Sequence, residues 1–273
     1  YFWNVILPKP VKKLNLENVK QHIAPFSGDM MNQRSFPPLD LIKIMKNTEY
    51  DVIYSHLPDW VQTGRYKNSI DTKIIGYCHW WESKPANGID RRPGKAKWLW
   101  LPIELLGVSQ MDTCYVNTQD QKSRILEQAK DIFNDDFVQK LDNILTVWNL
   151  GLPKKLIIEK RNIIVFNHRA AAYKGYPRFI ELMREYRKRR DDFTVWVPQL
   201  AGKSPETWVD NSKSPKHEYY QRLQQCKVGV QMRQTNYGWS VSGTDCLMNG
   251  TPMIWQESDC YREIDPNGMF FKM

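Results

Sequence analysis

Short apolar runs alternate with amphipathic stretches along the whole chain. This alternation is typical of a parallel α/β sheet, in which a helix follows each strand. In the first half, the pattern predicts strands at 3–7, 51–55, 73–78, 113–116 and 144–147. It also predicts helices at 39–45 and 122–130, with Thr118 or Asp120 as the cap of the second helix. The long polar stretches 8–33 and 83–97 are predicted as loops.

The second half shows the same alternation more regularly. It predicts strands at 163–166, 193–197, 228–232 and 253–255, and helices at 177–190, 217–226 and 245–249. Right-handed crossovers between such strands give a Rossmann-like sheet. Turn residues and charges at 151–155 indicate a boundary, so we expect one domain at 1–157 and another at 158–273. The predicted fold class is therefore α/β, with two Rossmann-like domains facing a central cleft.

The composition is that of a soluble globular protein, with 41% hydrophobic and 25% charged residues. No apolar run approaches the roughly 18–20 residues that cross a bilayer. The five cysteines are widely scattered and show no metal-ligand spacing. They predict reduced thiols in a cytoplasmic protein.

The net charge is +9, and the cationic excess is spread over both halves of the chain. A distributed positive charge favours polyanionic partners such as nucleic acid. It equally suits an enzyme whose substrate carries a diphosphate. Charge alone therefore does not choose between these two classes.

Two cations, Arg169 and Lys174, follow the predicted strand 163–166. Ligands of a doubly wound sheet lie outside the carboxyl ends of its strands, so this loop should face the ligand crevice. The two side chains could grip both phosphates of a diphosphate, the arginine with a planar fork. Gly175 would let the backbone pass close to the ligand. The alternative is a pair of solvated loop cations.

The small residues Ser242, Gly243 and Thr244 precede Asp245, which opens the predicted helix 245–249. Thr244 is the expected cap, and free amides at such a helix start can hold an anion. Asp245 could accept hydrogen bonds from sugar or ribose hydroxyls. Its alternative role is to complement the helix dipole, worth roughly 0.3–1 kcal/mol.

In the first half, His79 and Glu82 follow the predicted strand 73–78 and should face the same crevice. The histidine could orient a sugar hydroxyl or relay a proton, and Glu82 could act on an acceptor hydroxyl. A packed aromatic cluster with a satisfied histidine is the alternative. Arg91 and Arg92 open a predicted loop of cations and tryptophans that could grip phosphates and stack bases. A solvated loop beside core tryptophans explains that stretch equally well.

Two segments resemble GT-B glycosyltransferases of the retaining, nucleotide-sugar-dependent kind. Residues 167–175, Asn-His-Arg-Ala-Ala-Ala-Tyr-Lys-Gly, are similar to the strand-loop in which that family's Arg and Lys hold the donor diphosphate. Residues 237–252 resemble its Phe-Gly and Glu-Ala-Met-x-x-Gly-Thr-Pro signature, with Asp245 in place of the acidic residue that holds the ribose. The chain departs from the family at Thr235, where the family has Glu, and in the longer spacing from Gly238 to Asp245.

The resemblance implies a glycosyltransferase with a nucleotide-sugar such as UDP-glucose as co-substrate. No Asp-x-Asp triplet or His/carboxylate cluster indicates a bound metal, so we expect no metal and no cofactor. Arg169 and Lys174 would stabilise the leaving diphosphate, helped by amides near Ser242–Thr244, and Asp245 would hold the ribose. His79 would position the sugar or the acceptor.

A second similarity, in residues 167–174 and His79, is to transferases that modify nucleic acid, such as phage DNA α-glucosyltransferases. With the basic charge, it makes a modified base in DNA the leading acceptor, with Glu82, Arg91 and Arg92 on the acceptor side. Such a base has to be extruded from the duplex. One alternative is a transferase acting on a polysaccharide, a lipid-linked sugar or a small molecule. The other is a non-catalytic nucleic-acid-binding protein.

Overall fold

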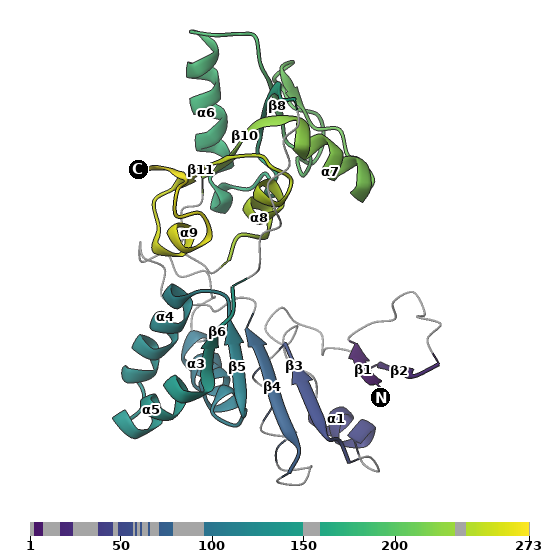
Figure 1. The fold of residues 1–273 in the computed structure, drawn as a ribbon, viewed down its shortest axis with the longest axis vertical. Coiled ribbons are helices and arrows are strands. Elements are labelled where there is room, and N and C mark those ends of the chain that lie inside the picture. The colour runs from purple at the N-terminus through teal and green to yellow at the C-terminus, as the bar shows by residue number, and fades with distance from the viewer. Residues whose placement is uncertain are drawn as a thin grey trace. The chain divides into compact units, whose positions relative to one another are not determined.

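The computed structural model describes residues 3–7, 17–23, 38–45, 49–56, 58, 61, 65, 71–78, 96–149, 159–232 and 239–272. The chain forms two compact units. Unit 1 contains Tyr1–Trp81, Asp90–Asn117 and Lys122–Trp148, and unit 2 contains Glu82–Ile89, Thr118–Gln121 and Asn149–Met273. Each unit has its own parallel sheet with helices (Figure 1). The domain boundary expected at residue 157 lies outside the described residues.

Unit 1 is built on a four-stranded parallel sheet whose strands lie side by side in chain order. The strands are β3 (Val52–Ser55), β4 (Lys73–Cys78), β5 (Thr113–Val116) and β6 (Leu145–Val147). The helices are α1 (Pro38–Met45), α3 (Ala96–Val108), α5 (Asp135–Ile144) and, from Lys122 onward, α4 (Gln119–Lys130). A separate parallel pair is formed by β1 (Trp3–Leu7) and β2 (Val19–Ile23). All the strands predicted in this half are confirmed, with ends that differ by no more than a residue or so.

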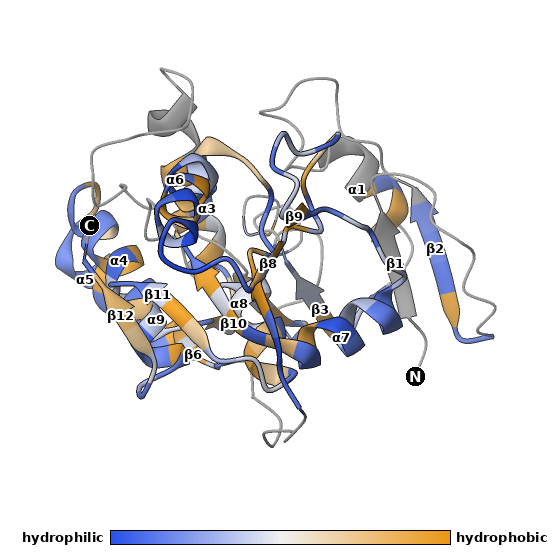
Figure 2. Cartoon of the chain, turned by 90° about the horizontal axis from the view of Figure 1, so that it is seen from above, coloured by the Kyte–Doolittle hydropathy of each residue, from blue (hydrophilic) through white to orange (hydrophobic). Residues whose placement is uncertain are grey.

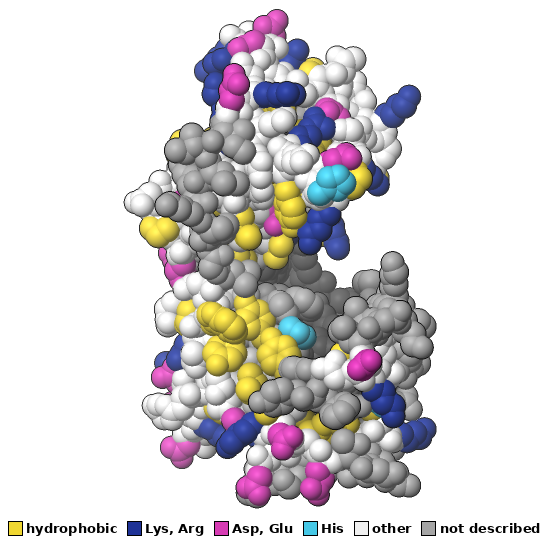
Figure 3. All heavy atoms as spheres, turned by 45° about the vertical axis from the view of Figure 1, so that its right-hand side comes forward, with side chains coloured by type: hydrophobic (Ala, Val, Ile, Leu, Met, Phe, Trp, Pro, Cys, Tyr) yellow, Lys and Arg dark blue, Asp and Glu magenta, His cyan; other side chains and the backbone are white. Residues whose placement is uncertain are grey.

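One face of the four-stranded sheet carries the core of unit 1. Alternate strand residues are buried there with apolar residues of the helices, among them Ile53, Ile74, Cys114, Leu145, Leu105, Ile125 and Leu141. The alternation has a period of two because successive side chains of a strand point to opposite faces. Tyr54 and Trp148 are instead exposed by 46% and 58%. Figure 3 shows a group of hydrophobic side chains on the surface of this unit.

The sequence pattern does not predict β2, α3 or α5. Trp98 and Trp100 lie in α3, so the loop expected over residues 91–100 is wrong from Ala96 onward. This helix is apolar over most of its length and contains Pro102, so it lacks the amphipathic period of a surface helix. The predicted cap of α4 is confirmed, because Thr118 Oγ1 accepts a hydrogen bond from the amide of Gln121.

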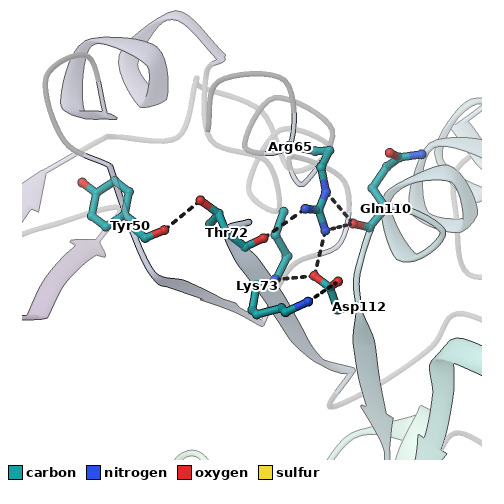
Figure 4. Close-up of polar contacts among 7 residues, drawn as sticks. Tyr50, Arg65, Thr72, Lys73, Gln110 and Asp112 are labelled. Atoms are coloured by element: carbon teal, nitrogen blue, oxygen red, sulfur yellow. Dashed lines mark hydrogen bonds and ion pairs between the residues drawn. The ribbon is translucent and has the colours of Figure 1, made fainter. Parts of the chain in front are cut away.

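A polar cluster holds together the N-terminal ends of β4 and β5 (Figure 4). The Arg65 guanidinium donates to the backbone oxygens of Gln110 and Thr72. It also donates to the Asp112 carboxylate at 2.8 Å, and the same carboxylate accepts from the amide of Ile74 at 2.8 Å. These bonds fix Arg65 against the sheet.

Unit 2 is built on a six-stranded parallel sheet in the order β12-β11-β10-β7-β8-β9. The strands are β7 (Arg161–Val165), β8 (Thr194–Trp196), β9 (Val209–Asp210), β10 (Cys226–Gln231), β11 (Met253–Gln256) and β12 (Met269–Phe271). From β7, the chain first adds strands on one side of the sheet and then crosses to add β10, β11 and β12 on the other. This is the strand order of a Rossmann fold, and its direction reverses between β7 and β10.

Helices cover both faces of the unit 2 sheet. They are α6 (Tyr176–Arg187), α7 (Lys216–Gln225), α8 (Val241–Met248) and α9 (Asp259–Ile264). Phe179 and Ile180 of α6 are buried in one core cluster, whereas α7, α8 and α9 contribute to a second cluster around Trp196 and Trp255. Figure 2 shows hydrophobic residues in the strands of this sheet and mainly hydrophilic residues on α7. The Rossmann-like second half predicted from the sequence is confirmed. No helix among the described residues is long and apolar enough to cross a membrane.

Candidate functional site

The strand order locates a ligand crevice in unit 2. In open parallel sheets, ligands bind at the carboxyl ends of the two strands between which the strand order reverses. Here these strands are β7 and β10. The residues that follow β7 include Asn167, Arg169 and Lys174, and β10 ends at Gln231. The candidate site is therefore built on these two strand ends.

Arg169 and Lys174 lie around a shared aromatic ring. Arg169 Nη1 donates to Tyr173 Oη at 3.5 Å, and Lys174 Nζ lies 5.4 Å from the centre of the same ring. A short 3-10 helix, η2 (Ala172–Lys174), places the tyrosine between the two cations. The loop thus carries two positive charges that both contact one tyrosine side chain, and two cations in one loop suit the two phosphates of a diphosphate.

Gly175 brings the end of this loop against the tip of β10. Its φ of 77° lies in the left-handed region, which favours glycine. A Cβ at this position would overlap the carbonyl oxygen of Met232, the residue after β10. The observed path of the loop therefore excludes any side chain at residue 175.

The start of α8 differs from the predicted one. The helix begins at Val241, and its cap is Ser240, whose Oγ accepts from the amide of Gly243 at 3.2 Å. Thr244 is not the cap, because its buried hydroxyl donates back to the Ser240 oxygen at 2.9 Å. Asp245 consequently lies in the second turn of the helix and does not open it.

The first turn of α8 packs directly on the indole ring of Trp255. A Cβ on Gly243 would overlap the Trp255 side chain, so only glycine allows this contact. The amides of Gly243 and Thr244 are engaged with Ser240. Among the described residues, the amides of Val241 and Ser242 have no hydrogen-bond acceptor, and they are the first two of the helix. A helix start with free amides favours an anion.

Asn167 joins the cationic loop to α8. Its Nδ2 donates to the backbone oxygen of Ser242 at 2.7 Å and to Tyr219 Oη at 3.0 Å. Asn167 is fully buried and lies two residues before Arg169. The loop after β7 and the first turn of α8 are therefore in direct contact.

Asp245 faces the same network from the second turn of α8. Tyr219 Oη donates to Asp245 Oδ2 at 3.4 Å. Burial raises the pKa of the Asp245 carboxyl, and the Tyr219 bond and the positive charge of Lys216 partly oppose this. Burial also raises the pKa of Tyr219, so its hydroxyl stays a hydrogen-bond donor at neutral pH. The network can present one carboxylate oxygen to a ligand hydroxyl.

The structure thus links Asn167, Ser242 and Asp245 through Tyr219, and places Gly175, which ends the loop of Arg169 and Lys174, against the residue after β10. The candidates of the first half, His79, Glu82, Arg91 and Arg92, lie outside the described residues. Within the described part of the chain, no three His, Cys, Asp or Glu side chains come together as a metal site would require. All five cysteines are buried, and none of them forms a disulfide.

Sequence reasoning missed three residues of this site, Asn167, Tyr219 and Gln231. Asn167 follows a predicted strand directly, and that position was a usable signal. Tyr219 and Gln231 gave none, because their contacts are to residues distant in the chain.

Solved structures share this architecture. TarM, a protein of S. aureus, matches with a TM-score of 0.63 at 14% identity, over 86% of this chain and 48% of that chain. A trehalose-6-phosphate synthase matches with a TM-score of 0.65 at 11% identity, over 99% and 81%. HepE from Anabaena, in complex with UDP, matches with a TM-score of 0.62 at 11% identity, over 93% and 72%. The fold is GT-B.

No family model matches the sequence, and no curated protein matches it. The chain spans about half the length of TarM and of the pneumococcal O-GlcNAc transferase GtfA. At identities this low, the likeness concerns the GT-B fold alone. Activity has to be argued from the site itself.

Proposed function

We propose that this chain is a glycosyltransferase that takes a hexose from a nucleotide-sugar donor, such as UDP-glucose, held at the carboxyl ends of β7 and β10. One observation carries the proposal: the Asn167–Ser242 hydrogen bond of 2.7 Å puts the loop of Arg169 and Lys174 against the start of α8. A loop that carries two cations, in contact with a helix start that has free amides among the described residues, can form a site for a diphosphate.

The chemistry follows from where negative charge develops. As the bond between the anomeric carbon and the diphosphate breaks, charge builds on the leaving phosphate, and groups already aimed at it lower the barrier. Arg169 and Lys174 supply this stabilisation, with the Val241 and Ser242 amides beside them. Asp245 accepts from the ribose hydroxyls, and His79 positions the sugar or the acceptor.

We further propose transfer with retention at the anomeric carbon. The trehalose-6-phosphate synthase that shares this fold is described as transferring with retention. The pneumococcal GtfA and the Anabaena HepE were both solved with UDP, which supports UDP as the nucleotide.

For the acceptor, we propose a modified base in DNA. The net charge of +9 supports a polyanionic acceptor. A DNA acceptor predicts that the KM for the acceptor rises steeply with salt. The lysine and arginine side chains of the protein displace counterions from the DNA phosphates on binding, and added salt opposes this release. Activity on a neutral saccharide at a rate indifferent to salt would exclude DNA and favour a polysaccharide, lipid-linked or small-molecule acceptor.

Replacing Arg169 with Ala tests the donor site. Turnover of a UDP-sugar, measured as UDP release, should fall about a hundredfold or more, as is typical when a preorganised charge is lost. Arg178→Ala is the matched control, because Arg178 is an exposed arginine of α6 paired with Glu181. Equal rates in the two variants would remove Arg169 from the mechanism. A wild-type chain that binds DNA but turns over no nucleotide-sugar would indicate a non-catalytic nucleic-acid-binding protein.

A further inference from the structure

We propose that Gln231, the last residue of β10, is a positioning residue that holds the start of α8 at a fixed distance from the loop of Arg169 and Lys174. This inference rests on the proposed donor site. Gln231 is 1% exposed, so it touches no ligand and acts through its neighbours.

Both ends of the Gln231 carboxamide are engaged. Oε1 accepts from Ser240 Oγ at 3.2 Å, and Nε2 donates to Tyr261 Oη at 3.1 Å. Both partners are hydroxyls, which can donate or accept, so each end of the carboxamide is held by one hydrogen bond. Tyr261 is itself buried and stacked on Trp255, with ring centres 4.8 Å apart. The carboxamide is therefore a rigid support.

Ser240 transmits this support to the helix. Its hydroxyl donates to Gln231 and accepts from the amide of Gly243 at 3.2 Å, so one side chain links the strand end to the first turn of α8. Without the Gln231 acceptor, the Ser240 hydroxyl can rotate to other partners, and its oxygen is no longer held in one position at the start of the helix. The free amides of Val241 and Ser242 belong to this same turn.

The next residue along the chain touches the other half of the site. The Met232 carbonyl lies against Gly175, which ends the loop of Arg169 and Lys174. Two consecutive residues at the end of β10 thus contact both parts of the proposed diphosphate site, namely the loop of Arg169 and Lys174 and the start of α8. The spacing between cations and amides is set by this one strand end.

Two substitutions separate positioning from core stability. Gln231→Met keeps the length and burial of the side chain but removes both hydrogen bonds. Gln231→Glu keeps an acceptor for Ser240 in either protonation state, and the Tyr261 hydroxyl can donate to its carboxylate or accept from its carboxyl. UDP affinity, measured by calorimetry, should fall about tenfold for Gln231→Met, the effect of losing one well-oriented hydrogen bond between the start of α8 and the ligand. It should stay near wild type for Gln231→Glu.

A double-mutant cycle with Ser240→Ala tests the transmission. Because Gln231 acts through Ser240, the double variant Gln231→Met/Ser240→Ala should bind UDP no more weakly than the weaker single variant. Thr251→Val is the control for stability alone. Thr251 is fully buried, and its hydroxyl donates to the Leu223 oxygen beyond the far end of α8. The Thr251→Val variant should have a lower Tm than wild type and an unchanged UDP affinity.

The outcomes are distinct. Equal UDP affinity in Gln231→Met and wild type would overturn the inference and leave the donor site standing, as would equal losses in Gln231→Met and Gln231→Glu. A wild-type chain that binds none of UDP, GDP and ADP would overturn the proposed function and this inference with it. If Gln231→Met does not fold, Gln231→Glu and Ser240→Ala still decide, because the inference requires near-normal affinity in the first and a loss in the second.

Discussion

Asp245 combines a structural cost with a proposed binding role. It is half-buried, and burial raises the pKa of its carboxyl. A carboxyl whose folded pKa lies above its unfolded value binds more protons in the folded state, so stability falls as pH rises through the window between the two values. At neutral pH the ionised carboxylate therefore destabilises unit 2, and a ligand hydroxyl that donates to it would offset this cost.

Asp245→Asn should separate the two effects. The amide oxygen still accepts from Tyr219, but no charge is buried, so the variant should have a higher Tm than wild type at neutral pH. The difference should vanish as the pH falls to about 4, near the ordinary carboxyl value, in a series of thermal melts. UDP affinity should fall about tenfold, because a charged acceptor is lost. Unchanged affinity would contradict the ribose-binding role.

Some residues of the site can be predicted from the sequence and others cannot. Arg169 and Lys174 are predictable because they directly follow an apolar strand, and the strand end fixes where they lie. The side-chain hydrogen bonds of Tyr219 and Gln231 reach partners that are at least 26 and 9 residues away in the chain. Such contacts are a property of the folded chain, and no local spacing announces them.

Lys160 stabilises the ends of two helices at once. Its Nζ donates to the Gln224 oxygen at 2.6 Å, in the last turn of α7, and to the Gly250 oxygen at 2.8 Å, just after α8. The carbonyls at the C-terminal end of a helix carry partial negative charge, so a cation there is favourable.

Lys160→Met should therefore lower the free energy of unfolding by about 2 kcal/mol, the value of two charge-assisted bonds partly offset by the retained apolar stem. Urea denaturation measures the change. Lys227→Met is the control, because Lys227 is exposed and its Nζ donates to a side-chain oxygen, that of Asn162, at 3.1 Å. Equal losses in both variants would contradict a specific capping role.

The cluster around Arg65 stabilises the N-terminal ends of β4 and β5. Burial tends to raise the pKa of Asp112, but the bonds from the Ile74 amide and Arg65 outweigh it and the net pKa is lowered. A carboxyl with a lowered folded pKa contributes stability above its unfolded value, and this contribution is lost as pH falls through the folded pKa.

Arg65→Met should cost about 2 kcal/mol at neutral pH, because partly buried backbone oxygens lose their donor. Its stability should also fall less on acidification below about pH 4 than that of wild type, since Asp112 loses the main partner that lowers its pKa. Lys73→Met should change little, because Lys73 is 65% exposed and lies 3.7 Å from Asp112. A parallel acid dependence in Arg65→Met and wild type, from urea titrations over a pH series, would rule out this coupling.

Helices and strands differ in how well the sequence predicts them. The strands of unit 2 are predictable because they are short, apolar and bounded by polar residues. α3 is not, because it lacks a polar face that would show a helical period. The sequence pattern predicts the start of α8 four residues too late, at Asp245 and not at Val241, because serine and threonine are both common caps and Thr244 directly precedes the acidic residue. Packing on Trp255, which only Gly243 allows, selects the earlier start.

Taken as a whole, the chain has a GT-B fold with a Rossmann strand order in unit 2, and its proposed donor site lies where that order reverses. The fold class is predictable because the alternation of strands and helices leaves few topologies open. The acceptor is not predictable from this alternation. The residues expected to contact it lie outside the described part of the chain.

Heat protection by nucleoside diphosphates tests whether unit 2 holds a donor. A ligand that binds only the folded chain stabilises it by about 2.7 kcal/mol when present at a hundred times its Kd. We expect UDP, GDP or ADP to raise the Tm of the wild-type chain, and the same nucleotide to give no shift in Arg169→Ala/Lys174→Ala. No shift with any of the three, or an undiminished shift in the double variant, would contradict a diphosphate site at these residues.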